Sequence, residues 1–173
     1  AIAARERLWL HVDAAYGGVA AMLPSHVHVL AGADRADSVI VNPHKWLFTP
    51  VDLSAFYCRR MDVISAAISL TPDYLRTREA GEVRNLMDTG IQLGRRFRAL
   101  KLWMVLRTFG AQQLREHIAM HIELARNFAE WVDRQPDFER LAPAPFSVVC
   151  FRWRPAETMM REDELNAANE RLV

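Results

Sequence analysis

The sequence predicts an α/β fold: a mainly parallel sheet with one antiparallel strand, followed by the start of a small α+β domain. Two short apolar stretches that favour strands, residues 8–12 and 38–41, each run directly into a polar motif. Asp13 and Lys45, which follow these stretches, are 32 residues apart, close to the roughly 30 residues of a βαβ unit. The third observation is a change in the apolar pattern at Gly110, where we place a domain boundary.

The elements of the first domain follow from spacing and breakers. Residues 20–30 predict a short, irregular helical stretch interrupted by Pro24, and residues 31–34 predict a loop. The second strand ends at Pro43, and residues 53–58 alternate as a third strand. Only about ten residues join these two strands, fewer than the dozen or more of a parallel crossover. We therefore expect the third strand to be antiparallel, with Lys45 in the bend.

The rest of the chain divides into a loop, two helices and a strand. Residues 70–92 are polar and broken by Pro72, Gly81 and Gly90, which predicts a long loop of the functional or disordered kind. Residues 96–109 are apolar nearly all round, which predicts a buried helix that Gly110 ends. Residues 111–135 are amphipathic with Pro136 beyond them, and residues 147–153 predict a strand. The predicted domains are residues 1–110 and 111–173.

Bulk composition excludes several classes of function. The 173 residues are 51% hydrophobic and 25% charged, as in an ordinary globular protein. A net charge of +1 indicates no nucleic acid partner and no anionic membrane. No run approaches the ~18 apolar residues of a membrane span, and no signal peptide is visible. Cys58 and Cys150 lie in apolar runs, which predicts buried thiols in a cytoplasmic protein.

The two polar motifs suggest a specific chemistry. A lysine and an aspartate, each at the end of a strand, are what pyridoxal phosphate (PLP) requires: Lys45 would hold the aldehyde as a Schiff base, and Asp13 would keep the pyridine nitrogen protonated. Both would lie along one edge of a parallel sheet, where open α/β folds bind ligands. We expect Trp46 and its apolar neighbours to desolvate Lys45, which lowers the pKa of its amine. The simpler alternatives are a surface lysine in a hairpin and an aspartate that caps residues 14–18.

At these motifs the chain resembles the group II PLP-dependent amino-acid decarboxylases, and most closely the aromatic-L-amino-acid decarboxylases. The matching segments are LWLHVDAAYGG (8–18), ADSVIVNPHKWL (36–47), DLSA (52–55), TPDYLRT (71–77) and LGRRFRALKLW (93–103). They keep the family's order and spacing over roughly the first 110 residues. The resemblance implies a partial fold type I, in which residues 1–110 are the C-terminal half of the PLP-binding large domain and residues 111–173 begin the small C-terminal domain. Relative to the family, the main phosphate loop and the ring-stacking histidine are missing, so we expect a fragment.

The resemblance also implies roles for four further residues. Ala15 would pack against one face of the cofactor ring, and Asn42 and His44 would hold its phosphate. Tyr74, on a mobile loop, would return a proton to Cα after carbon dioxide leaves, which favours amine formation; related enzymes with phenylalanine there make aldehydes. Each residue also has a simpler structural role as the alternative: Asn42 would start a turn, His44 would be a structural histidine, and Tyr74 would be an ordinary loop tyrosine. The family forms homodimers in which this loop reaches the partner's site.

We therefore expect PLP-dependent decarboxylation of an L-amino acid, of the aromatic class, to the amine and carbon dioxide. The alternatives are a catalytically silent truncated chain, and an aldehyde synthase or glutamate decarboxylase of the same fold. Two histidine pairs, at 26 and 28 and at 117 and 121, have the spacing of metal ligands but lack the further ligands of a closed site, so we expect no metal. The arginines at 95, 96 and 98 form one short cluster, which favours pairing with carboxylates over binding nucleic acid.

Overall fold

The computed structural model describes residues 2–69, 86–157 and 159–172. The chain divides into two compact units, Ala1–Gly110 and Ala111–Val173. The division falls at the glycine where the apolar pattern of the sequence changes. The first unit contains the predicted sheet and both polar motifs, so it carries the candidate site.

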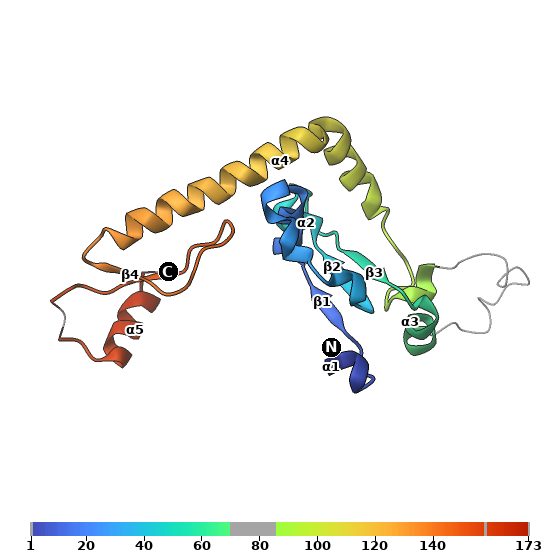
Figure 1. Ribbon diagram of the computed structural model, residues 1–173, viewed down its shortest axis with the longest axis horizontal. Helices are drawn as coiled ribbons and strands as arrows, with labels where there is room; N and C mark the ends of the chain where they lie inside the picture. The colour runs from blue at the N-terminus through green and yellow to red at the C-terminus, as the bar shows by residue number, and fades with distance from the viewer. Residues whose placement is uncertain (1, 70–85, 158, 173) are drawn as a thin grey trace, which may run out of the picture. The chain divides into compact units, whose positions relative to one another are not determined.

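The first unit is built on a three-stranded sheet in the order β1-β2-β3 (Figure 1). A short helix, α1 (Ile2–Arg5), precedes β1 (His11–Asp13), which pairs in parallel with β2 (Ser38–Val41). β3 (Ala55–Cys58) pairs with β2 in the antiparallel sense. The predicted reversal of the third strand is confirmed. The connection between β2 and β3 is too short for a parallel crossover, which explains the antiparallel pairing.

Three 3-10 helices connect β1 to β2: η1 (Gly17–Met22), η2 (Pro24–Leu30) and η3 (Ala33–Arg35). Pro24 opens the second of them, and Gly32 precedes the third with φ 82°, a left-handed conformation that glycine adopts without cost. The predicted irregular helical stretch is confirmed. Its apolar residues pack with those around the second motif to form the core of the unit: Ala14, Ala15, Val19, Ala20, Leu23, Ala36, Trp46, Leu47 and Leu53.

Two short helices flank β3. The single turn α2 (Pro43–Trp46) begins at a proline, whose fixed φ suits the first helical position. α3 (Met61–Ile68) follows β3 and was not predicted from the sequence, because eight residues give too short a window for a helical period. Of the predicted loop at 70–92, residues 70–85 lie outside the described part of the chain, and η6 (Leu86–Thr89) is a 3-10 turn.

The long element α4 (Arg98–Asp133) is two helices joined at Gly110, which has the non-helical angles φ 68° and ψ 169°. The predicted end of the first helix at this glycine is confirmed. The prediction that this helix is buried is wrong for the structure described: Leu100 is 42% exposed and Trp103 58% exposed. An apolar pattern identifies a face that favours burial, but the described residues of the first unit do not cover this one.

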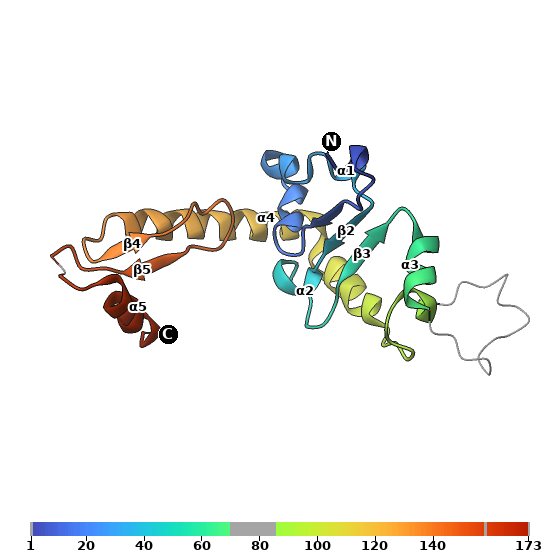
Figure 2. The same cartoon turned by 90° about the horizontal axis from the view of Figure 1, so that it is seen from below.

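The second unit packs a helix against a hairpin. The part of α4 after Gly110 buries the predicted amphipathic face, with Leu114, Ile118 and Val132 fully enclosed. β4 (Phe138–Arg140) and β5 (Phe151–Trp153) pair antiparallel (Figure 2), and α5 (Glu162–Glu170) follows.

The predicted strand at 147–153 forms only over its last three residues. Cys150, just before it, is exposed and Cys58 is half-buried, so the prediction of buried thiols is wrong for Cys150; it lies in an irregular segment outside the hairpin ladder. Among the helices in the described ranges, none is long and apolar enough to cross a membrane.

Candidate active site

The two polar motifs meet at one edge of the sheet. Asp13 is the last residue of β1, opposite Ile40 of β2. Beyond the strands, the Ala14 N–H donates to Ile40 O at 3.0 Å and the Asn42 N–H donates to Ala15 O at 3.0 Å. The chain then enters α2, which lies at the end of the sheet where β1 finishes (Figure 1). Main-chain hydrogen bonds therefore bring the segments of Asp13 and Lys45 together.

Asp13 uses one of its two carboxylate oxygens locally. Its Oδ1 accepts a hydrogen bond from the Ala15 N–H at 2.9 Å, which is the capping role that the simpler reading of the sequence expected. The bond fixes the side chain and leaves Oδ2 as the oxygen for a further partner. Since Asp13 is exposed, that partner can approach from outside the sheet. The structural role and the proposed chemical role are thus compatible.

Lys45 lies on the open side of α2. Trp46 is 4% exposed and Leu47 is also buried, whereas Lys45 is exposed. The expectation that apolar neighbours desolvate Lys45 is therefore wrong for the residues described, because the single helical turn directs Trp46 inward and Lys45 outward. Its amine is accessible to a ligand at this edge.

His44 is held by the main chain that leads into β3. The Leu53 N–H donates to His44 Nδ1 at 3.0 Å, and Leu53 O is also in contact with Nδ1. Leu53 itself is 5% exposed, so the backbone that holds the ring is fixed in the core. With Nδ1 directed at Leu53, Nε2 is the ring nitrogen on the opposite side, where it can donate to an anion.

Asn42 occupies the N-cap position of α2, yet its side chain makes no capping hydrogen bond. Its Oδ1 is buried without a hydrogen-bond partner among the described residues. A buried amide oxygen with no partner costs free energy, and such groups are often explained by an ion or ligand that completes them. The unpartnered Oδ1 therefore fits a residue beside a bound group that can donate a hydrogen bond at this edge.

Ala15 and Tyr74 complete the set of sequence-predicted site residues. Ala15 is buried, and its main chain bonds both Asp13 and Asn42, so it lies between the two motifs. Tyr74 lies outside the described residues. Five of the six predicted residues are therefore brought to one edge of the sheet, while their individual roles stay predictions.

Two contacts that the sequence did not predict join the motifs. The rings of Tyr16 and Trp46 stack with centroids 5.0 Å apart and planes 11° apart. Gly18 packs so closely that a Cβ there would lie 2.8 Å from Ala14 Cβ and 3.2 Å from Val41 Cγ2. The signal available in the sequence was an aromatic residue in each motif, but pairing them requires knowledge of the register.

A cluster of three cations surrounds Asp52, next to Leu53. Arg96 and Arg98 form ion pairs with its carboxylate at 3.1 and 2.9 Å, and Lys101 Nζ lies 3.9 Å away. The prediction that carboxylates pair with the arginines of this segment is confirmed for Arg96 and Arg98. The cluster ties the start of α4 to the chain that holds His44.

The hydrogen bond from Arg98 is the main reason why the pKa of Asp52 falls from 3.8 to about 2, with Arg96 adding a favourable charge. A carboxyl with a lowered pKa in the folded state stabilises the fold above the unfolded value of 3.8, and this stabilisation is lost as pH falls towards about 2.

We therefore expect Asp52→Asn to flatten the dependence of the melting temperature on pH between 3.8 and about 2, relative to the wild type. Thermal unfolding followed by circular dichroism across this window measures the effect, and Asp34→Asn at an exposed aspartate is the matched control. Parallel wild-type and Asp52→Asn curves would contradict the assignment.

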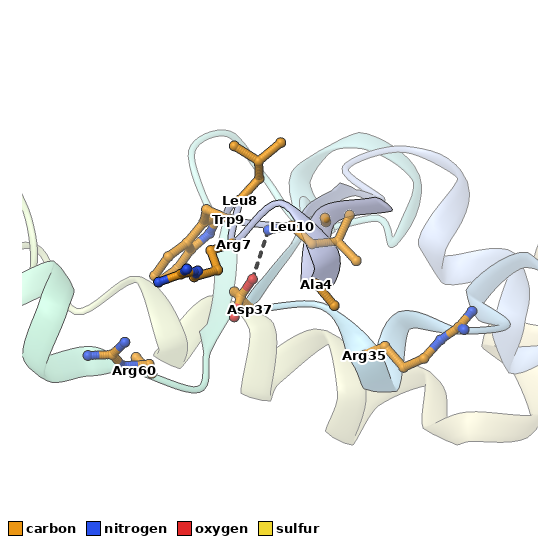
Figure 3. A pocket seen from close by; sticks show the side chains of 9 residues that line it. Ala4, Arg7, Leu8, Trp9, Leu10, Arg35, Asp37 and Arg60 are labelled. Atoms are coloured by element: carbon orange, nitrogen blue, oxygen red, sulfur yellow. Dashed lines mark hydrogen bonds between the residues drawn. The ribbon is translucent and has the colours of Figure 1, made fainter. Parts of the chain in front are cut away.

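A cavity of about 520 Å³ lies elsewhere in the first unit. It is bordered by Arg7, Trp9, Arg35, Asp37 and Arg60, and Asp37 accepts the Leu10 N–H at 2.8 Å (Figure 3). Leu10 and Asp37 precede β1 and β2, whereas the candidate site follows them. The cavity is therefore at the opposite ends of the strands and takes no part in the site.

Within the ranges that the structure describes, no three His, Cys, Asp or Glu side chains gather where they could hold a metal ion. The ring centroids of His26 and His28 lie 6.0 Å apart, with the ring planes inclined by 27°.

Comparison with known proteins gives the class. The family model described as "Pyridoxal-dependent decarboxylase conserved domain" matches residues 1–154. The chain belongs to this family. Its fold is that of part of a PLP-dependent fold type I decarboxylase.

Two relatives and one solved structure illustrate the similarity. The chain is 40% identical over 176 residues to tryptophan decarboxylase 1 of Oryza sativa subsp. japonica, covering 99% of this chain and 34% of the relative. It is 40% identical over 167 residues to phenylacetaldehyde synthase of a Rosa hybrid cultivar, covering 94% and 33%. A crystal structure of Oryza sativa TDC with PLP and tryptamine superposes with a TM-score of 0.87 at 40% identity, covering 99% of this chain and 36% of that one. The chain spans about a third of the length of these relatives.

Proposed function

We propose that the chain forms the lysine-bearing part of a PLP-dependent carboxy-lyase that converts an aromatic L-amino acid to its amine and carbon dioxide. The observation that carries the proposal is the convergence of Asp13 and Lys45 at one sheet edge through the bond between Asn42 and Ala15. A carboxylate and an accessible amine at one ligand-binding edge are the two groups that this cofactor needs.

The residues at this edge fit the cofactor. The side-chain Nδ2 of Asn42 and the outward Nε2 of His44 would bind the phosphate, because both nitrogens can donate hydrogen bonds to its oxygens. Lys45 Nζ would hold the aldehyde carbon covalently. Ala15 would lie against the ring, where a larger side chain would push the ring away.

When bound, PLP supplies an electron sink conjugated to the substrate's α-carbon. Asp13 would hold a proton on the pyridine nitrogen through Oδ2, while its Oδ1 stays bonded to the Ala15 N–H. Lys45, held on the open side of α2, would exchange places with the substrate amine and return when the product leaves. Tyr74 would deliver a proton to Cα.

Aromatic substrates are favoured by the relatives. Those at about 40% identity include enzymes named for tryptophan and tyrosine, and a solved structure at 34% identity holds L-tryptophan. The assay that tests the proposal measures carbon dioxide and amine from tryptophan, tyrosine, phenylalanine and glutamate with the gene product that carries this sequence. Absence of product from every aromatic acid would refute it.

A second candidate is an aldehyde synthase, because two relatives at 40% identity are named phenylacetaldehyde synthase. The residue at position 74 separates the two, since a tyrosine there can return the proton that amine formation requires.

We expect Tyr74→Phe to lower amine formation by about 10²–10⁴-fold, the range for a lost general acid. It should instead release aldehyde, with dissolved oxygen as the oxidant and ammonia and hydrogen peroxide as co-products. Chromatography of the products checks this, with Tyr57→Phe at an exposed tyrosine of β3 as the control. Unchanged amine production by Tyr74→Phe would remove the proton-donor role.

Three further parts of the proposal concern the whole protein. Residues 1–110 would be the C-terminal half of the cofactor-binding domain and residues 111–173 the beginning of the small domain, in keeping with the division at Gly110. The protein would act as a homodimer. It would reside in the cytoplasm, which suits the free thiols of Cys58 and Cys150.

A further inference from the structure

We propose that Tyr16 and Trp46 are positioning residues whose stacked rings set the spacing between Asp13 and Lys45. The inference rests on the proposed function, since it concerns the two groups that would hold the cofactor. Tyr16 lies three residues after Asp13, and Trp46 directly follows Lys45. The stack therefore joins the two motifs next to their chemical groups.

The geometry of the stack is that of a specific contact. The centroids are 5.0 Å apart and the planes 11° apart, within the range of ~4.5–7 Å that favourable aromatic pairs adopt. Trp46 is 4% exposed, so its ring is fixed in the core. Tyr16 is half-buried, which makes it the better residue to change.

α2 depends on such contacts for its orientation. A single helical turn has too few internal hydrogen bonds to be stable alone. The hydrogen bonds of its own backbone are local: the Lys45 N–H donates to Asn42 O, and the Leu47 N–H donates to Pro43 O. Side chains on either side of Lys45 make the longer-range contacts, His44 with Leu53 and Trp46 with Tyr16. Lys45 is exposed, so its position follows that of the turn.

The segment of Tyr16 is held on its other side. The Asn42 N–H bonds Ala15 O, and Gly18 closes on Ala14 and Val41 with no space for a Cβ. These contacts fix the main chain up to Asn42. Beyond Asn42, the stack of Trp46 on Tyr16 is the following contact between the two motifs. Because Lys45 and Trp46 are neighbours on the same helical turn, about 100° apart around its axis, a rotation of α2 that separates Trp46 from Tyr16 would also move Lys45 Nζ relative to the ring that Asp13 would hold.

The experiment uses the gene product that carries this sequence, freed of cofactor and titrated with PLP. We expect Tyr16→Leu to raise the dissociation constant by about threefold to tenfold, as the loss of an aromatic pair implies. It should also lower the fraction of Lys45 that borohydride traps and shift the pH at which the visible absorbance of the bound cofactor changes. Tyr16→Phe, which keeps the ring, should match the wild type.

Tyr57→Leu makes the same chemical change at an exposed tyrosine of β3, and it should leave all three readouts unchanged. Measurements are made at a temperature at which the circular dichroism of every cofactor-free variant equals that of the wild type, which separates positioning from folding. Wild-type binding and trapping by Tyr16→Leu would overturn the proposal. Equal losses in Tyr16→Phe and Tyr16→Leu would also overturn it, because the hydroxyl would then be the essential group. A wild-type protein whose trapped cofactor is not on Lys45 would instead refute the proposed function.

Discussion

Lys45→Arg should abolish covalent attachment of the cofactor and lower kcat by on the order of 10³-fold or more. Lys45 would both hold the cofactor and release the product by exchanging with it, and the loss of a single acid or base group already costs about 10²–10⁴ in other enzymes. Arginine keeps the positive charge but stays protonated, so it cannot attack an aldehyde. Borohydride reduction followed by peptide mapping measures the attachment, and release of carbon dioxide measures kcat.

The sequence provides a matched control for this experiment. It contains two lysines, Lys45 and Lys101, and Lys101 lies in the ion cluster of Asp52. Lys101→Arg keeps the charge of that cluster, so it should leave attachment and kcat unchanged. If the reduced cofactor were found on the Lys101 peptide of the wild type, the attachment site would be Lys101 and the assignment of Lys45 would be refuted.

Asp13→Asn should lower kcat by about 10²–10⁴-fold while the cofactor is still attached to Lys45. The amide keeps an oxygen that can accept the Ala15 N–H, so the turn after β1 is preserved. It removes the negative charge that would keep the pyridine nitrogen protonated, and thus weakens the electron sink. Steady-state kinetics and the trapping of Lys45 separate the two effects.

Two further variants serve as comparisons for Asp13→Asn. Asp13→Ala removes both the charge and the turn hydrogen bond, and should therefore also lower the melting temperature of the cofactor-free protein. Asp34→Asn, at an exposed aspartate of η3, should alter neither kcat nor the melting temperature. A kcat of Asp13→Asn within a factor of about three of the wild type would exclude a role for its charge, because a pyridinium partner acts on the chemical step.

The sheet and the site edge could be predicted because each rests on short-range chemistry. Strand ends next to Asp13 and Asn42, the short link to β3 and the break at Gly110 all leave signals within a few residues. The same reasoning predicted that carboxylates pair with the arginines near residue 96, and the structure supplied Asp52 as the partner.

The errors arose where the outcome depends on what packs against a residue. The helix from Arg98 to Gly110 has the composition of a buried helix, yet Leu100 and Trp103 are exposed, since composition does not say which surface covers a face. Lys45 has apolar neighbours in the sequence, but they do not surround its side chain. Within the single turn of α2, Trp46 points into the core and Lys45 points out. The stack of Tyr16 on Trp46 needed the parallel register of β1 and β2, which no local pattern contains.

The linkage between β1 and β2 has an evolutionary consequence. Three 3-10 turns separate the strands, and hydrogen bonds across the strand ends, not the number of intervening residues, hold the segment of Asp13 next to the segment that leads to Lys45. Insertions and deletions among the exposed residues of η2 can therefore accumulate between lineages without disturbing the chemistry. A shift of one position within β1 would instead turn the carboxylate to the opposite face of the sheet, so selection should act on strand register far more strictly than on loop length.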